Sequence, residues 1–180
     1  MRRVPRILLA AWALFPFASS AGVSPDASAT GAAAAGQLAN GPDLAFLASA
    51  TRANTNEVAA GKLAAEKGHS AAVKAFGDRM VTDHGAAGQR LDELAQQKHA
   101  PAPQSRTANS ANVELLRRLS GDAFDRAYAD LMVGDHQQVI GAFEREVAEG
   151  TDPDIKTFAS ETLPTLRAHL SMARQLSPGR

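Results

Sequence analysis

The chain has 180 residues, 19 lysines and arginines against 19 aspartates and glutamates, and no cysteine. This length leaves room for one ordinary domain with a core. Without cysteine the chain has no disulfide framework, no thiolate metal site and no cysteine for lipid attachment. The balanced charge argues against nucleic acid as a partner.

Residues 1–21 have the pattern of a signal peptide. Three arginines precede the apolar run of residues 7–18, which is too short to span a bilayer, and small residues lead up to Ala21. We therefore predict cleavage after Ala21 and a periplasmic or secreted protein. No later apolar run approaches the length of a transmembrane helix, so we predict no transmembrane segment in the mature chain.

Residues 22–42 are small and polar without apolar periodicity, which predicts a flexible tether. A helical domain is predicted from residue 43 to residue 177. Its first helix is expected over 43–67, with Asp43 as the N-cap. The second is expected from an N-cap at Ser70 to about Lys98, after a break at Gly68.

The second half of the domain predicts two further long helices after a polar connection and a short amphipathic piece around residues 112–120. The third long helix is expected from about Asp122 to Gly150. The fourth starts with Thr151 or Asp152 as its cap and is expected to kink at Pro164.

Four amphipathic helices without a strand-period segment predict an all-α four-helix bundle. The joints at Gly68 and Gly150 are short, so the helices on either side of each joint should be antiparallel neighbours. The middle connection of roughly twenty residues is long enough to cross the length of the bundle. With this crossover helices two and three run parallel, which is a ferritin-like arrangement.

The sequence "MVTDH" at residues 80–84 returns as "MVGDH" at residues 132–136. Both histidines, and His169 of the fourth helix, replace apolar residues in the buried stripes of their helices, and Glu57 lies on the inner face of the first helix. An unpaired buried polar group costs roughly 2–7 kcal/mol. Glu57, His84, His136 and His169 are therefore the candidate metal ligands.

Three imidazoles and one carboxylate form an adequate ligand set for zinc or non-haem iron. Copper is also considered, because Met80, Met132 and Met172 each lie within four residues of a core histidine. Packing of these methionines in the core is the simpler interpretation. The Glu-x-x-His pairs of di-iron bundles are absent, with Val81 and Leu166 at the glutamate positions, which argues against ferroxidase chemistry.

Two alternatives need no metal and no other cofactor. The buried groups can satisfy one another and only fix the register of the helices, in a structural or interaction module with an envelope protein as partner. They can also form a cluster that responds to pH. Asp83 and Asp135, each next to a core histidine, are predicted to bond across helices or to orient an imidazole.

No sequence motif indicates an enzyme. The chain has no Gly-rich phosphate loop, no H-E-x-x-H and no G-x-S-x-G sequence. Nothing in the sequence nominates particular residues for a catalytic Ser-His-Asp site, so we assign no catalytic residue. A non-enzymatic role is favoured.

The run from Glu57 to Ala95, together with "FDRAYADLMVGDH" and "LPTLRAHL", resembles the bacterial domain of unknown function 4142 family. The resemblance covers about residues 43–176. It implies an exported protein with a ferritin-like helical fold and no established activity. The positions that match the family motif are Glu57, Asp83 with His84, Asp135 with His136, and Leu163-Pro164 with His169.

Overall fold

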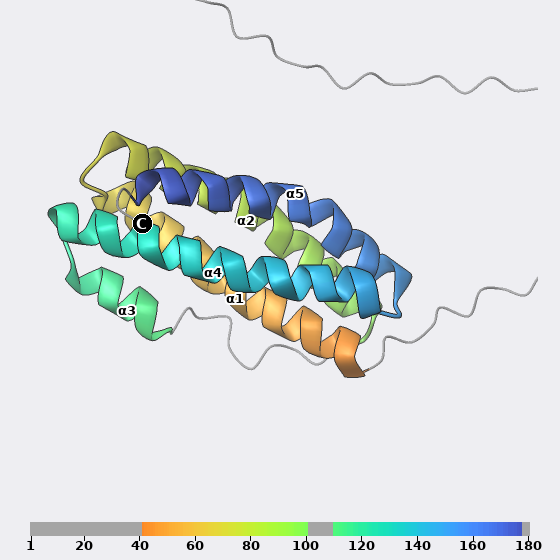
Figure 1. Ribbon diagram of the computed structural model, residues 1–180. Helices are drawn as coiled ribbons and strands as arrows, with labels where there is room; N and C mark the ends of the chain where they lie inside the picture. The colour runs from red at the N-terminus through yellow and green to blue at the C-terminus, as the bar shows by residue number, and fades with distance from the viewer. Residues whose placement is uncertain (1–40, 101–109, 178–180) are drawn as a thin grey trace, which may run out of the picture. The chain divides into compact units, whose positions relative to one another are not determined.

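The computed structural model describes residues 41–100 and 110–177. The predicted signal peptide and nearly all of the predicted tether lie outside the described residues. Within them the chain forms five α-helices and no strand (Figure 1), which confirms the all-α prediction. The helices are α1 (Gly41–Lys67), α2 (Ala71–Gln97), α3 (Ala111–Arg118), α4 (Gly121–Glu149) and α5 (Pro153–Leu176).

The four long helices lie alongside one another and are packed in pairs (Figure 1). The most extensive contacts join α1 to α2 and α4 to α5, as the short joints predict. Further contacts join α1 to α4 and α2 to α5, and the short α3 packs against α1 and α4. Each long helix therefore has two long neighbours, which encloses the inner faces of all four.

The predicted helix ends are largely confirmed. Ser70 caps α2 by accepting a hydrogen bond from the Val73 amide, and Asp152 caps α5 by accepting from two backbone amides. Gly150 follows the end of α4. Helix α5 extends from Pro153 to Leu176 with Pro164 inside it, so this proline does not end the helix. The kink at Pro164 stays a prediction.

The prediction that Asp43 caps the first helix is wrong, because α1 already begins at Gly41. Asp43 is completely buried in the first turn. Its carboxylate accepts hydrogen bonds from the Thr151 amide at 3.1 Å, the Thr151 hydroxyl at 2.7 Å and the Asp152 amide at 3.0 Å. The carboxylate therefore fastens the start of α1 to the joint between α4 and α5, a partner more than a hundred residues away in sequence.

The core consists of two apolar clusters. One is formed by Phe46, Leu47, Ala50, Leu91, Leu94, Ile140, Phe143, Ile155, Phe158, Ala159, Leu163 and Leu166. The other is formed by Ala60, Ala64, Val73, Phe76, Met80, Val113, Leu116, Phe124, Tyr128, Met132 and Ala173. Along each long helix, the predicted site residue lies between the members of the first cluster and those of the second. The polar site therefore has apolar packing on both sides.

Helices α1 and α2 approach closely at Gly77. A Cβ atom on this residue would lie 2.6 Å from the Ala65 amide nitrogen and 2.7 Å from the Gly61 carbonyl oxygen. Both atoms belong to the backbone of α1, so a side chain has no room unless the two helices separate. The pair depends on glycine at this position.

Replacing Gly77 with Ala should lower the free energy of unfolding by roughly 1–3 kcal/mol, because the added methyl group overpacks the interface. The matched control is Gly85→Ala on the same helix, where a Cβ atom meets nothing within 4 Å. That exchange should raise stability by roughly 0.5–1 kcal/mol, because alanine loses less backbone entropy in a helix. Urea unfolding of both variants measures the difference, and equal stabilities would contradict the close approach.

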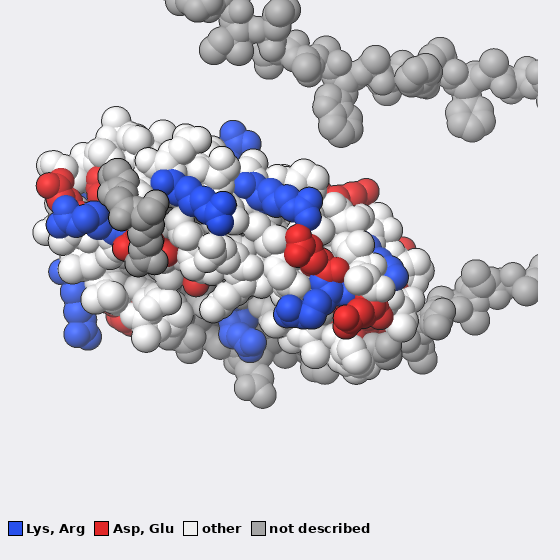
Figure 2. Space-filling model, in the orientation of Figure 1, with Lys and Arg blue, Asp and Glu red and all other residues white. Residues whose placement is uncertain are grey.

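Basic and acidic side chains are interspersed on the face shown in Figure 2, and neither sign forms a continuous area there. This distribution agrees with the equal numbers of basic and acidic residues in the sequence. Among the helices that the structure describes, none has a stretch apolar and long enough to cross a bilayer.

Candidate metal centre

The four predicted site residues meet inside the helical domain, one from each long helix. Glu57 comes from α1, His84 from α2, His136 from α4 and His169 from α5, and all four are buried. One ring nitrogen from each histidine lies within 4.8 Å of the other two. The ring centroids are 5.7, 5.3 and 5.5 Å apart, so the three imidazoles surround a common point.

Two of the histidines use Nδ1 for a hydrogen bond to an oxygen outside the three rings. His84 Nδ1 lies 3.1 Å from the side-chain oxygen of Asn54, and His136 Nδ1 lies 2.9 Å from the backbone carbonyl oxygen of Met132. Both oxygens only accept hydrogen bonds, so each Nδ1 must carry the proton. The Nε2 atom of each ring is then left as a lone-pair acceptor.

The third histidine uses its other nitrogen in the same way. His169 Nε2 donates to a carboxylate oxygen of Asp83 at 2.8 Å, and the same oxygen accepts a hydrogen bond from Arg79 at 3.1 Å. Asp83 thus bonds across from α2 to α5, as its position in the sequence predicted. The proton on Nε2 leaves Nδ1 of His169 as the lone-pair acceptor.

The three lone-pair nitrogens, Nε2 of His84, Nε2 of His136 and Nδ1 of His169, are buried and have no hydrogen-bond partner in the structure. The rings cannot satisfy one another, because every ring N–H group already donates to another acceptor. A buried acceptor left unpaired costs about 1–3 kcal/mol. The three rings therefore present three buried electron pairs without a proton to share among them.

The carboxyl group of Glu57 lies beside the Nδ1 atoms of His84 and His136, on the side of each ring away from its Nε2 atom. Its Oε2 is 3.2 Å from Nδ1 of His84, and its Oε1 is 3.6 Å from Nδ1 of His136. Since Nδ1 and Nε2 point away from opposite sides of an imidazole, Glu57 faces the Nδ1 edges of the rings. In this structure it is placed to orient the two imidazoles, and its role as a direct ligand stays a prediction.

Burial sets the protonation of the centre. It lowers the pKa of His84 to about 3, helped by the positive charges that His136 and His169 would carry, and lowers the pKa of His136 to about 4. Burial also raises the pKa of Glu57 to about 8, with the Asp135 carboxylate adding to the shift. At neutral pH the imidazoles are therefore neutral, which is the form that binds a metal ion.

Sequence reasoning missed two groups that hold the rings. Asn54 lies one turn before Glu57 on the inner stripe of α1, and this position was its only signal. Gly88 leaves room for its amide, since a Cβ atom there would lie 2.9 Å from Nδ2. The Met132 carbonyl oxygen has no side-chain signal at all. The Met80 and Met132 side chains are completely buried within the second apolar cluster.

The fold and the site define an all-helical protein with a buried three-histidine centre. The chain belongs to the family described as Domain of unknown function (DUF4142), whose model matches residues 27–176. This membership confirms the resemblance noted in the sequence.

Among solved structures, the fold is similar to the "Crystal structure of DUF305 fragment from Deinococcus radiodurans", with a TM-score of 0.68 and 16% sequence identity. The match covers 78% of this chain and 98% of that chain. At this identity the likeness concerns the fold alone. A comparison with curated proteins finds no match.

Proposed function

We propose that this protein binds one transition-metal ion through His84, His136 and His169. The observation that carries the proposal is the set of three buried imidazole nitrogens with no hydrogen-bond partner, whose N–H groups all donate elsewhere. A histidine that ligates a metal almost always donates its other N–H group to a carboxylate, carbonyl or water. Each of these three rings follows that rule, with an oxygen acceptor of its own.

Zinc or copper suits the centre best. Imidazole binds zinc, copper and iron, whereas non-haem iron usually takes a carboxylate as a direct ligand beside two histidines. Zinc–nitrogen bonds are about 2.0–2.1 Å, so binding would draw one nitrogen of each ring closer than the present spacing of up to 4.8 Å. The neutral rings bind such an ion without first losing protons.

We also propose that the protein is exported and meets the metal in the bacterial envelope. The support is the signal-peptide pattern of residues 1–21. A non-enzymatic role in envelope metal handling is consistent with the lack of sequence motifs for catalysis.

The wiring is proposed to be ferritin-like, with a long crossover from α2 to α4. Support comes from the order of the two apolar clusters along the chain. On α2 and on α4 the members of the second cluster come before those of the first, whereas on α1 and α5 the order is reversed. That order is expected if α2 and α4 run in the same direction.

The test is metal analysis of protein purified without chelator, followed by titration of the chelated protein with Zn²⁺, Cu²⁺ or Fe²⁺. We expect one equivalent of zinc or copper per chain, and a higher melting temperature when the ion is bound. At a ligand concentration of 100 times the Kd, the gain is about 2.7 kcal/mol. The absence of stoichiometric binding would leave the structural polar core as the better interpretation.

Replacing Asp83 with Asn should weaken metal binding by about 10–100-fold, because the carboxylate that fixes His169 and raises its basicity becomes a neutral amide. Asp78→Asn is the matched control, since Asp78 is exposed on the same helix. Isothermal titration with Zn²⁺ measures both variants. Equal affinities would show that the Asp83 contact does not support a ligand.

A further inference from the structure

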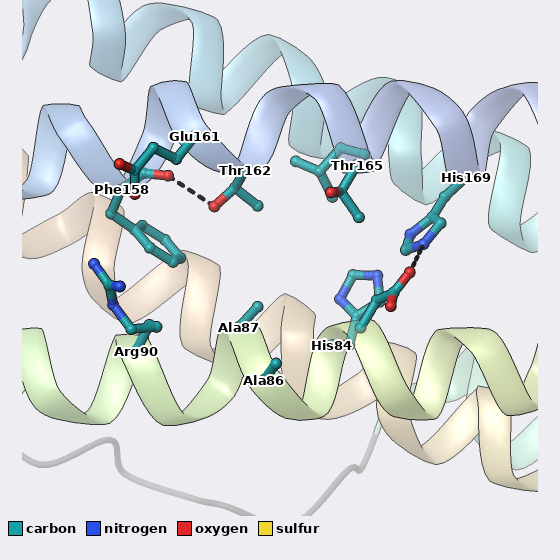
Figure 3. Close-up of a pocket in the computed structure, with 11 residues that line it drawn as sticks. His84, Ala86, Ala87, Arg90, Phe158, Glu161, Thr162, Thr165 and His169 are labelled. Atoms are coloured by element: carbon teal, nitrogen blue, oxygen red, sulfur yellow. Dashed lines mark hydrogen bonds and ion pairs between the residues drawn. The ribbon is translucent and has the colours of Figure 1, made fainter. Parts of the chain in front are cut away.

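The surface between α2 and α5 has a cavity that leads to the histidines. It has a volume of about 200 Å³ and is lined by residues of both helices. Figure 3 shows His84 and His169 at one end of this cavity and Arg90 and Phe158 at the other. Two of the three proposed ligands therefore border a space that is large enough for several water molecules.

A second depression approaches the centre from α1 and α4, but its lining includes Glu57 and none of the three histidines. Glu57 in turn faces the Nδ1 edges of His84 and His136, away from their lone pairs. Of these two cavities, the one between α2 and α5 borders the histidines.

Three histidines would fill only three of the four coordination positions around a tetrahedrally coordinated metal ion. Closed structural zinc sites take four protein ligands, whereas a site with three protein ligands keeps its fourth position for water or another ligand. Glu57 is not among the groups whose ligand atoms lie within 4.8 Å of one another. The proposed site therefore keeps a fourth position for water or another ligand.

The walls of the cavity indicate the size and charge of that molecule. Ala86 and Ala87 of α2 face a wall that includes Thr162 and Thr165 of α5, so small side chains leave the passage open. A bound divalent ion with three neutral ligands carries two positive charges, and Arg90 adds a third at the outer end. Two carboxylates of the lining, Glu161 and Asp83, oppose part of this charge, and that of Asp83 is paired with Arg79.

We infer that the cavity between α2 and α5 admits a small anion, with one to four non-hydrogen atoms, which binds the metal at its fourth position in place of water. The inference rests on the proposed metal site and makes that site open rather than structural. Its chemistry is ligand exchange: the anion donates an electron pair to the ion and a water molecule leaves.

The test uses the Co²⁺-loaded full chain, because the visible spectrum of Co²⁺ responds to its ligands, with sodium azide and sodium acetate as the added anions. We expect saturable spectral changes with either anion in the wild type. Ala87→Leu should keep Co²⁺ binding but raise the apparent Kd for azide at least tenfold, because leucine fills the passage. Thr165→Leu narrows it from α5 and should act in the same direction.

Ala75→Leu, an exchange at an exposed position on α2 outside the cavity, is the control and should respond to azide as the wild type does. If Co²⁺ binds but azide changes nothing, or acts equally on the wild type and both narrowed variants, the open site is overturned while the metal site stands. If Co²⁺ does not bind at all, the metal site and the open site both fail.

Discussion

Replacing His136 with Leu should abolish stoichiometric metal binding without lowering the stability of the metal-free protein. The ring supplies one of three proposed ligands, so its loss removes a third of the bonds between the protein and the ion. In the metal-free protein its Nε2 is an unpaired buried acceptor, which costs about 1–3 kcal/mol, and leucine has no such group. Urea unfolding in chelator and zinc titration measure the two effects.

This variant separates the metal site from the alternative of a structural polar core. If the imidazoles serve to fix helix register, His136→Leu should reduce the free energy of unfolding, and no metal effect should exist to lose. The control is His69→Leu, since His69 is largely exposed and lies 3.6 Å from Asp122 at a helix joint. It should bind zinc as the wild type does.

Replacing Glu57 with Gln should make the metal-free protein more stable than the wild type at pH 8, but not at pH 4.5. The pKa of Glu57 is raised from its usual 4.5 to about 8 by burial, with Asp135 adding to the shift. A raised pKa gives stability that is fully present below pH 4.5 and is lost as the pH rises through 8. Glutamine has the shape of the protonated acid at every pH.

The difference between wild type and Glu57→Gln should therefore change by roughly 3–5 kcal/mol between pH 4.5 and 8, at about 1.4 kcal/mol per pH unit. Thermal or urea unfolding in chelator at several pH values measures this change. Glu66→Gln, at an exposed position on the same helix, is the control and should show no comparable trend. A difference that does not vary with pH would contradict the buried neutral acid.

A bound metal ion should reverse the advantage that Glu57→Gln has over the wild type in the metal-free protein at pH 8. A divalent ion near the histidines favours the charged carboxylate, whose Oε2 lies 3.2 Å from Nδ1 of His84 and which offsets part of the positive charge. We expect Glu57→Gln to bind zinc about 10–100-fold more weakly than the wild type. Full loss of binding would favour Glu57 as a direct ligand, as the sequence suggested.

Much of the fold could be predicted from local sequence. Ser70 and Asp152 mark helix starts, and glycines 68 and 150 mark ends, because capping depends on residues within one turn. The prediction for Asp43 failed for the opposite reason: its partners Thr151 and Asp152 are close only in the folded chain. In the sequence, an aspartate that caps a helix looks the same as an aspartate that is buried and accepts hydrogen bonds from a distant part of the chain.

The site residues were predictable because an ionisable residue in an apolar stripe is visible from helical periodicity alone. Periodicity fixed which face His84, His136 and His169 occupy, and hence that they are buried. Periodicity could not give the height along the bundle axis at which residues of different helices line up. That height depends on the close packing of whole helices, such as the contact at Gly77.

The sequence by itself determined that this protein is all-α, that it belongs to its family, and which polar residues enter the core. Tertiary structure decided that three of these residues meet within 4.8 Å, and that Asn54, Asp83 and the Met132 carbonyl oxygen take up their N–H groups. The reason is that helix formation depends on neighbours in sequence, whereas the direction of a lone pair depends on acceptors contributed by other helices or by the backbone.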